Sequence, residues 1–141
     1  MRELGVMMKF SPLEDTLRGK KIVVVDDSIV RGTTTGKLVQ LLKDAGAAEV
    51  HIRITAPPVK HPCFYGIDMA KEEELVAFRH SVEEIRAMIG ADSLSYLSIE
   101  GAVGGVQQDK DKFCRACFDG IYPIAIPKDV AVTKMALERA A

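Results

Sequence analysis

The chain has 141 residues, of which 48% are hydrophobic and 28% are charged, values typical of one globular domain and not of a disordered chain. Its 19 basic and 20 acidic residues give a net charge of −1, which argues against a general nucleic-acid or anionic-membrane surface but does not exclude a local phosphate site. The apolar runs are too short for a membrane helix, and the start carries no signal-peptide core. We therefore expect a cytoplasmic protein with no nucleic-acid partner and no membrane partner.

The first third of the chain predicts a strand–helix–strand unit. Residues 1–19 have no clear hydrophobic period and are expected to form a loop or a short arm. Ile22–Val25 is a continuous β-branched run, typical of a central strand in a parallel sheet. Val50–Thr55 alternates apolar and polar residues and predicts a second strand. Between them Thr33–Ala45 predicts a helix, whose apolar face consists of Leu38, Leu41, Leu42 and Ala45.

The rest of the chain is expected to add further helices and a third strand. Ser81 and Glu84 match a capping box, with Gly90 closing the helix that follows. The remaining predicted elements are a loop over His61–Asp68, an acidic helix over Lys71–Phe78, a strand over Leu94–Ile99, a connector over Gly101–Lys112, a turn at Asp119-Gly120 and a helix over Asp129–Ala140. Three strands are few for this class. The sequence therefore predicts an incomplete α/β fold, either a fragment or a sheet completed elsewhere.

The segment Val23–Gly36 combines features of a phosphate site. Asp26 and Asp27 follow a predicted strand, at the edge where α/β folds place ligands, and their carboxylates suit ribose hydroxyls or a hydrated Mg²⁺. Gly32 allows close backbone approach, and the first N–H groups of the next helix form an anion site. Each feature alone is also typical of a turn or a helix cap. Their contiguity favours a site for a 5′-phosphorylated ribose.

The three cysteines indicate metal or redox chemistry. Cys114 and Cys117 form a CxxC, and Cys63 lies well upstream. In a reducing compartment this pattern favours such chemistry over a structural disulfide. Zinc binding and simple burial of Cys63 stay open, as does a redox disulfide, although the CxxC follows a polar connector instead of a strand. His61, beside Cys63, is a candidate additional ligand.

The segment Val23–Gly36 resembles the phosphoribosyl pyrophosphate (PRPP) signature of type I phosphoribosyltransferases. His61–Asp68, Ser81–Ile85 and Cys114–Pro123 extend the resemblance to one family, the iron–sulfur type of glutamine phosphoribosylpyrophosphate amidotransferase, or amidophosphoribosyltransferase. The resemblance implies that residues 1–141 are the C-terminal portion of a phosphoribosyltransferase domain with a parallel sheet flanked by helices. Family members start with a glutaminase domain whose nucleophile is an N-terminal cysteine. Met1 offers none, so that domain is expected to be absent.

The resemblance also implies a reaction. The family makes 5-phosphoribosylamine and pyrophosphate from PRPP and glutamine-derived ammonia, the first step of de novo purine synthesis. Asp26 and Asp27 are implied as catalytic residues that hold the ribose and share Mg²⁺, and Lys9 as a loop residue that closes over pyrophosphate. The chain alone is expected to be inactive, and the enzyme to be a homo-oligomer. The implied contacts of the 5′-phosphate, from PRPP or a purine nucleotide monophosphate, are Ser28, Arg31, Gly32, Thr33, Thr34 and Thr35.

The cysteines have a role in the same resemblance. Cys63, Cys114 and Cys117 resemble three of the four thiolate ligands of the family's [4Fe–4S] cluster. The fourth ligand would lie upstream of the residues present here.

Two alternatives come from other classes of protein. Lys20–Gly46 also resembles the opening of a response-regulator receiver domain, in which Asp26 and Asp27 bind Mg²⁺ and Asp68 accepts phosphate. The segment Arg31–Gly36 and the cysteines would have no purpose there, which favours the transferase. A non-catalytic nucleotide-binding or cluster-carrying module is the third alternative.

Overall fold

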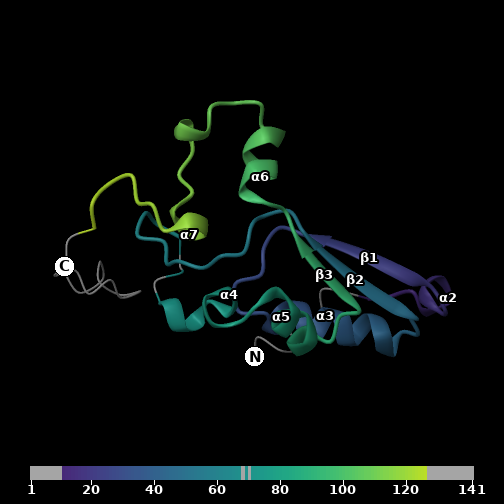
Figure 1. The fold of residues 1–141 in the computed structure, drawn as a ribbon. Helices are drawn as coiled ribbons and strands as arrows, with labels where there is room; N and C mark the ends of the chain where they lie inside the picture. Colours follow the sequence, from purple (N-terminus) through teal and green to yellow (C-terminus); the bar gives the residue numbers. More distant parts are fainter. Residues whose placement is uncertain (1–10, 68, 70, 127–141) are drawn as a thin grey trace.

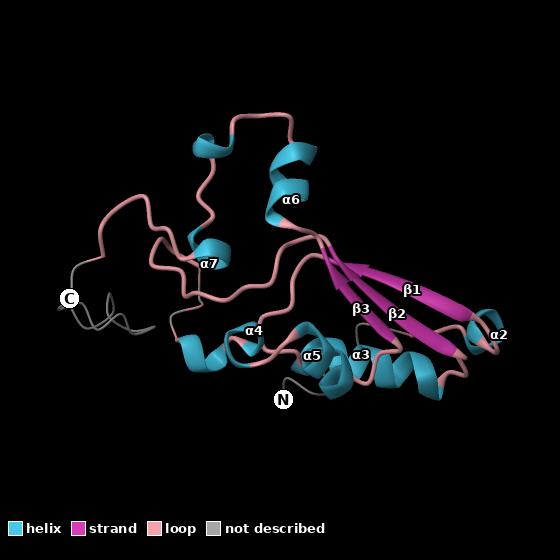
Figure 2. Cartoon of the chain, viewed as in Figure 1, coloured by secondary structure: helices cyan, strands magenta, loops and turns pink. Residues whose placement is uncertain are grey.

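The computed structural model describes residues 11–67, 69 and 71–126 of the chain. Within them, strands β1 (Lys21–Asp26), β2 (Glu49–Ile54) and β3 (Ser93–Tyr96) form a parallel sheet in the order β1-β2-β3. Helices α3 (Thr33–Asp44) and α5 (Val82–Ile89) cover one face of this sheet (Figures 1 and 2). The predicted α/β class with a parallel sheet flanked by helices is confirmed. The shorter elements are α2 (Glu14–Leu17), η1 (Glu72–Glu74), α4 (Val76–Arg79), α6 (Ile99–Gly105), η2 (Lys110–Lys112) and α7 (Ala116–Asp119).

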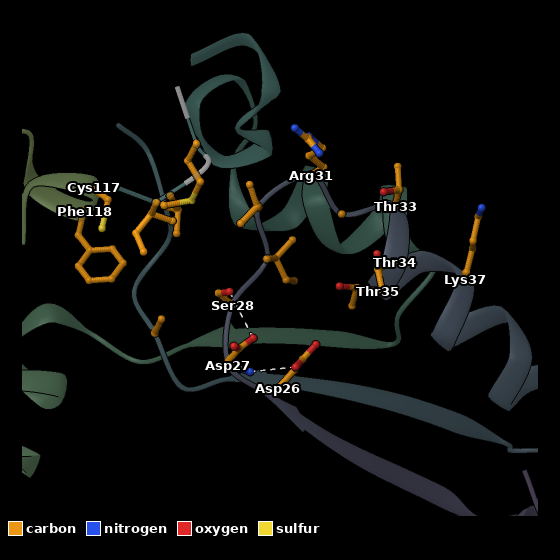
Figure 3. Close-up of a pocket in the computed structure, with 17 residues that line it drawn as sticks. Asp26, Asp27, Ser28, Arg31, Thr33, Thr34, Thr35, Lys37, Cys117 and Phe118 are labelled. Carbon is orange, nitrogen blue, oxygen red and sulfur yellow. Dashed lines mark hydrogen bonds between the residues drawn. The ribbon is translucent and has the colours of Figure 1, made fainter. Parts of the chain in front are cut away.

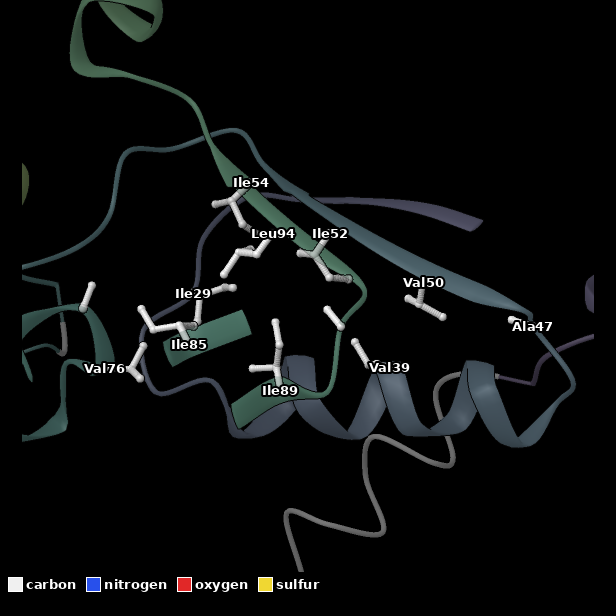
Figure 4. Packing of buried hydrophobic residues seen from close by; sticks show 12 residues of the cluster. Ile29, Val39, Ala47, Val50, Ile52, Ile54, Val76, Ile85, Ile89 and Leu94 are labelled. Atoms are coloured by element: carbon white, nitrogen blue, oxygen red, sulfur yellow. The ribbon is translucent and has the colours of Figure 1, made fainter. Parts of the chain in front are cut away.

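The core lies between the sheet and its two long helices (Figure 4). The alternation predicted for the second strand is confirmed, because Val50, Ile52 and Ile54 are at most 2% exposed. They pack with Ile85 and Ile89 of α5 and with Val39 of α3. On α3 the buried residues are Thr35 and Val39, whereas Leu38 and Leu41 are half-buried and line a recess beside α2.

The prediction that Ile22–Val25 forms a central strand is wrong in the described part of the chain. β1 lies at the edge of the sheet, and β2 occupies the centre. Val23 and Val25 are 60% and 65% exposed, since the helices cover only the opposite face. A continuous β-branched run therefore marks a strand suited to burial on both faces, although only one face of β1 is buried here.

Helix α5 has the capping box that the sequence predicts. The Ser81 side chain accepts a hydrogen bond from the Glu84 backbone N–H, and the Glu84 carboxylate accepts one from the Ser81 N–H at 2.7 Å. Gly90 ends the helix in the left-handed conformation, with φ 72°. Local sequence signals thus fix both ends of the helix that packs beside α3.

Several predicted boundaries differ from the structure. The helix expected over Lys71–Phe78 is interrupted at Leu75, whose extended backbone separates η1 from α4. The third strand ends at Tyr96, and the expected connector begins as helix α6, because the Ser98 side chain caps Gly101 at 2.9 Å. The expected N-terminal loop contains the short helix α2.

The helix predicted over Asp129–Ala140 lies outside the described residues. Across the described part of the chain, every helix is too short or too polar to cross a lipid bilayer.

Candidate functional site

A cavity of about 740 Å³ opens where β1 ends (Figure 3). One side is polar and consists of the loop from Asp26 to the first turn of α3. The other side is largely apolar and comes from two segments far along the chain. Its lining residues there include Val59, Ile67, Met69, Cys117 and Phe118. The cavity is thus built at the carboxyl edge of the sheet, as the sequence predicts.

Two carboxylates stand at the end of β1 on this cavity. Asp26 is half-buried and Asp27 is exposed. Asp26 Oδ1 accepts the backbone N–H of Asp27 at 2.9 Å, and Asp27 Oδ1 accepts the Ser28 hydroxyl at 3.3 Å (Figure 3). Among the described residues, no group of three His, Cys, Asp or Glu side chains is placed to hold a metal by itself. One or two carboxylates still fit Mg²⁺, which usually completes its shell with water and substrate phosphate oxygens.

The first turn of α3 forms the anion-binding side of the cavity. Gly32 is its N-cap, with φ 78° in the left-handed region, and no side chain caps the turn. The N–H groups there have no partner within the helix and lie at the positive end of its dipole. Thr33 and Thr34 are exposed, whereas Thr35 is 5% exposed. The arrangement can bind a phosphate group through backbone N–H groups and threonine hydroxyls.

Two cationic residues belong to the lining of the same cavity. Arg31 forms an ion pair with Glu74 in η1. Lys37 was not among the predicted site residues. It lies one helical turn after Thr33, and long helical side chains point back toward the N-terminus of their helix. That spacing is the signal in the sequence that could have identified it.

The CxxC segment contributes to the cavity wall, which the sequence did not predict. The Cys117 carbonyl accepts the backbone N–H groups of Lys60 and His61 at 2.9 and 3.0 Å, so α7 lies against the loop that carries Cys63. Burial raises the pKa of the Cys117 thiol, and negative charge on Cys63 and Cys114 raises it further. All three cysteines are free thiols. The loop of Cys63 and the CxxC segment thus lie side by side, although among the described residues the three thiols do not form a group placed to hold a single metal ion.

Two predicted residues cannot be placed. Lys9, the expected loop residue over pyrophosphate, and Asp68, the phosphate acceptor of the receiver alternative, both lie outside the described residues. Ser28, Arg31, Gly32, Thr33, Thr34 and Thr35 all line the cavity together with Asp26 and Asp27.

Comparison with known proteins gives relatives of one kind. The chain is 54% identical to the amidophosphoribosyltransferase of Synechococcus elongatus over 138 residues, which are 98% of this chain and 28% of that protein. Identity is 52% with the Bacillus subtilis enzyme of the same name, over 94% of this chain and 29% of that protein. The Methanothermobacter thermautotrophicus enzyme is 51% identical over 92% of this chain and 27% of that protein. The chain thus spans between a quarter and a third of the length of these relatives.

Solved structures agree with the sequence comparison. The Bacillus subtilis glutamine PRPP amidotransferase complexed with ADP and GMP superimposes with a TM-score of 0.78 at 52% identity, over 84% of this chain and 27% of that chain. A structure described as the allosteric regulatory enzyme of purine biosynthesis gives a TM-score of 0.78 at 51% identity, over 84% of this chain and 26% of that chain. No protein-family model matches the chain.

Proposed function

Because this chain is homologous over nearly its whole length to a segment of the amidophosphoribosyltransferases, we propose that it forms the PRPP-binding part of such an enzyme. In this proposal residues 1–141 are the C-terminal portion of the phosphoribosyltransferase domain. The exposed valines of β1 support this assignment, since further strands and helices of a larger sheet would cover them. The glutaminase region that the resemblance implies is proposed to lie in the part of the relatives that this chain does not span.

One observation carries the proposal: the two carboxylates and the anion-binding turn of α3 line a single cavity. The 5′-phosphate of PRPP would lie on the turn from Gly32 to Thr35, and the ribose hydroxyls on Asp26 and Asp27. In the reaction, ammonia forms a bond to the anomeric carbon while the bond from that carbon to pyrophosphate breaks. The contribution of these residues is to hold the sugar in a fixed orientation.

The proposal includes Mg²⁺ shared by Asp26 and Asp27, because their oxygens fit its ligand preference and face the cavity. When bound, the ion neutralises charge on the departing pyrophosphate. Lys9 is proposed to close over the pyrophosphate oxygens. Purine nucleotide monophosphates are proposed to compete for the site, since they carry the same ribose 5-phosphate.

We also propose that Cys63, Cys114 and Cys117 bind a [4Fe–4S] cluster. The donor types fit, because thiolates are the usual ligands of such clusters and hydrogen bonds hold the loop of Cys63 against the segment of Cys117. A four-iron cluster holds its thiolates farther apart than a single ion does, so their spacing need not match that of a mononuclear site. Such a cluster needs one ligand more than these three. The proposal also includes a cytoplasmic location, because an odd cysteine number with a CxxC is typical of metal or redox chemistry in a reducing compartment.

Binding of ribose 5-phosphate and of GMP to the 141-residue chain, with Mg²⁺ present, tests the proposal by calorimetry. Thr34→Val and Asp27→Asn are expected to weaken binding by roughly tenfold or more, because a hydrogen bond to a charged group is worth about 1.5–3 kcal/mol. Thr16→Val and Asp15→Asn are the matched controls, because both residues are exposed on α2 and neither lines the cavity. Wild-type protein that binds neither compound, or site variants that bind like the controls, would contradict the proposal.

A further inference from the structure

The loop from Asp26 to Gly32, here called the phosphate loop, is attached on its outer side to the segment that runs from η1 to α4. The backbone N–H of Val76 donates to the carbonyl of Val30 at 2.8 Å. One residue further along the loop, the Arg31 guanidinium pairs with the carboxylate of Glu74, 43 residues away in sequence. The two contacts thus attach two adjacent loop residues, Val30 and Arg31, to the same neighbouring segment.

That segment is itself fixed in the core. Leu75 is 1% exposed and Val76 is 8% exposed, so the backbone next to Glu74 has little freedom. The side chains of Arg31 and Glu74 are 45% and 41% exposed, which places their ion pair at the surface. Glu74 therefore lies on a rigid segment, and its partner Arg31 lies on the phosphate loop.

The Arg31 side chain points away from the two carboxylates of the site. Figure 3 shows its side chain on the side of the loop away from Asp26 and Asp27. Gly32, the next residue, is the N-cap of α3. The orientation of the backbone at Arg31 and Gly32 thus decides where the first N–H groups of α3 point.

We propose that Glu74 is a positioning residue of the phosphate loop. By holding Arg31 on the outer side of the loop, it keeps the backbone of Val30, Arg31 and Gly32 in the orientation that binds an anion. Arg31 then acts on the backbone through Glu74 and makes no contact with the phosphate, unlike the role that the family resemblance implies for it. The inference rests on the proposed function of this loop as the 5′-phosphate site.

The expected effect is modest because both side chains are partly exposed. Exposed ion pairs contribute a few tenths to about 1 kcal/mol, which corresponds to roughly two- to fivefold in an equilibrium constant. Loss of the pair should weaken binding of a phosphate ligand by this factor. It should also speed hydrogen exchange at the Val76 amide, whose acceptor is the loop itself.

The test uses the 141-residue chain with Glu74→Gln, Arg31→Glu, Glu74→Arg and the double reversal Arg31→Glu/Glu74→Arg. Ribose 5-phosphate binding and exchange at the Val76 amide are measured by NMR. The single variants should weaken binding and speed exchange, and the double reversal should restore both. Glu73→Gln, which removes a neighbouring exposed carboxylate of η1, is the control and should change neither.

Two results would overturn the inference. A double reversal that binds as poorly as Arg31→Glu would show that Arg31 contacts the phosphate directly. A Glu74→Gln variant that matches Glu73→Gln in binding and exchange would show that the pair positions nothing. Wild-type protein that fails to bind ribose 5-phosphate overturns the proposed function instead, and the exchange rates then still decide whether Glu74 positions the loop.

Discussion

Gly32 illustrates how backbone conformation, more than available space, restricts a site residue. Its φ of 78° lies in the left-handed region, yet a Cβ there would meet Ile89 at 3.6 Å and Ile29 at 3.9 Å, which are ordinary contacts. Gly32→Ala should therefore destabilise the protein by about 1 kcal/mol through backbone strain alone. Urea unfolding measures the change.

Gly36 is the matched control for this substitution. It lies within α3 outside the left-handed region, and its added Cβ would meet the Ile89 backbone at 3.6 Å. Since alanine is favoured over glycine in a helix by roughly 0.5–1 kcal/mol, Gly36→Ala should be neutral or stabilising. Equal destabilisation by the two substitutions would contradict the backbone explanation for Gly32.

Tyr96 and Tyr122 offer a second comparison between single residues. The Tyr96 hydroxyl is buried and has no hydrogen-bond partner among the described residues, and burial raises its pKa to about 12. Tyr96→Phe should thus be neutral or stabilising by up to about 1 kcal/mol, because it removes an unsatisfied buried group. Tyr122 donates to the Pro62 carbonyl at 2.8 Å, so Tyr122→Phe should cost about 1 kcal/mol in thermal unfolding. The opposite order of stabilities would argue that the Tyr96 hydroxyl has a partner.

At the scale of elements, the capping box of α5 predicts a pH dependence. Hydrogen bonds from the backbone and side chain of Ser81 hold the pKa of Glu84 below its ordinary value of 4.5. A carboxylate whose pKa is lower in the folded state stabilises the protein above its unfolded pKa, and this contribution is lost as the pH falls through the folded pKa. Stability should therefore drop below about pH 4.5 more steeply in wild type than in Glu84→Gln. Acid unfolding curves measure this, with Glu73→Gln in η1 as the control, and identical wild-type and Glu84→Gln curves would exclude the contribution.

Elements with local signals were predictable from the sequence, and elements that depend on distant contacts were not. Ser81, Glu84 and Gly90 specify α5 within one stretch of chain, and the alternation from Val50 specifies β2. Leu75 interrupts the expected acidic helix because its side chain is drawn into the core, at 1% exposure. No local pattern in the sequence predicts that packing.

The candidate site divides in the same way. The polar side, from Asp26 to Thr35, is contiguous in the chain, so its residue types and spacing could be interpreted directly. The apolar side brings Phe118 and Cys117 next to Val59. The contact of Arg31 with Glu74 spans 43 residues. Such neighbours follow from tertiary packing, which the sequence alone does not supply.

At the scale of the whole molecule, hydrogen bonds join the loop that carries Cys63 to the segment after the CxxC. Besides the bonds to the Cys117 carbonyl, the Tyr65 hydroxyl donates to the Ile124 carbonyl at 2.8 Å and accepts the Ile124 N–H at 3.1 Å. The ring of Tyr122 contacts those of Phe64 and Tyr65. These hydrogen bonds and aromatic contacts connect the two segments without the proposed cluster.

The proposed cluster can therefore be tested without unfolding the protein. Anaerobic reconstitution with iron and sulfide should give a brown wild-type protein that bleaches in air, because three thiolates leave one iron open. Cys63→Ser and Cys117→Ser should take up far less iron and sulfide by quantitative analysis. Their thermal unfolding should match that of the unreconstituted wild type, since the Cys117 contacts to Lys60 and His61 use the backbone. Equal uptake by all three proteins would show that these thiols are not cluster ligands. Variants that lose both iron and stability would show that the cysteines themselves hold the two segments together.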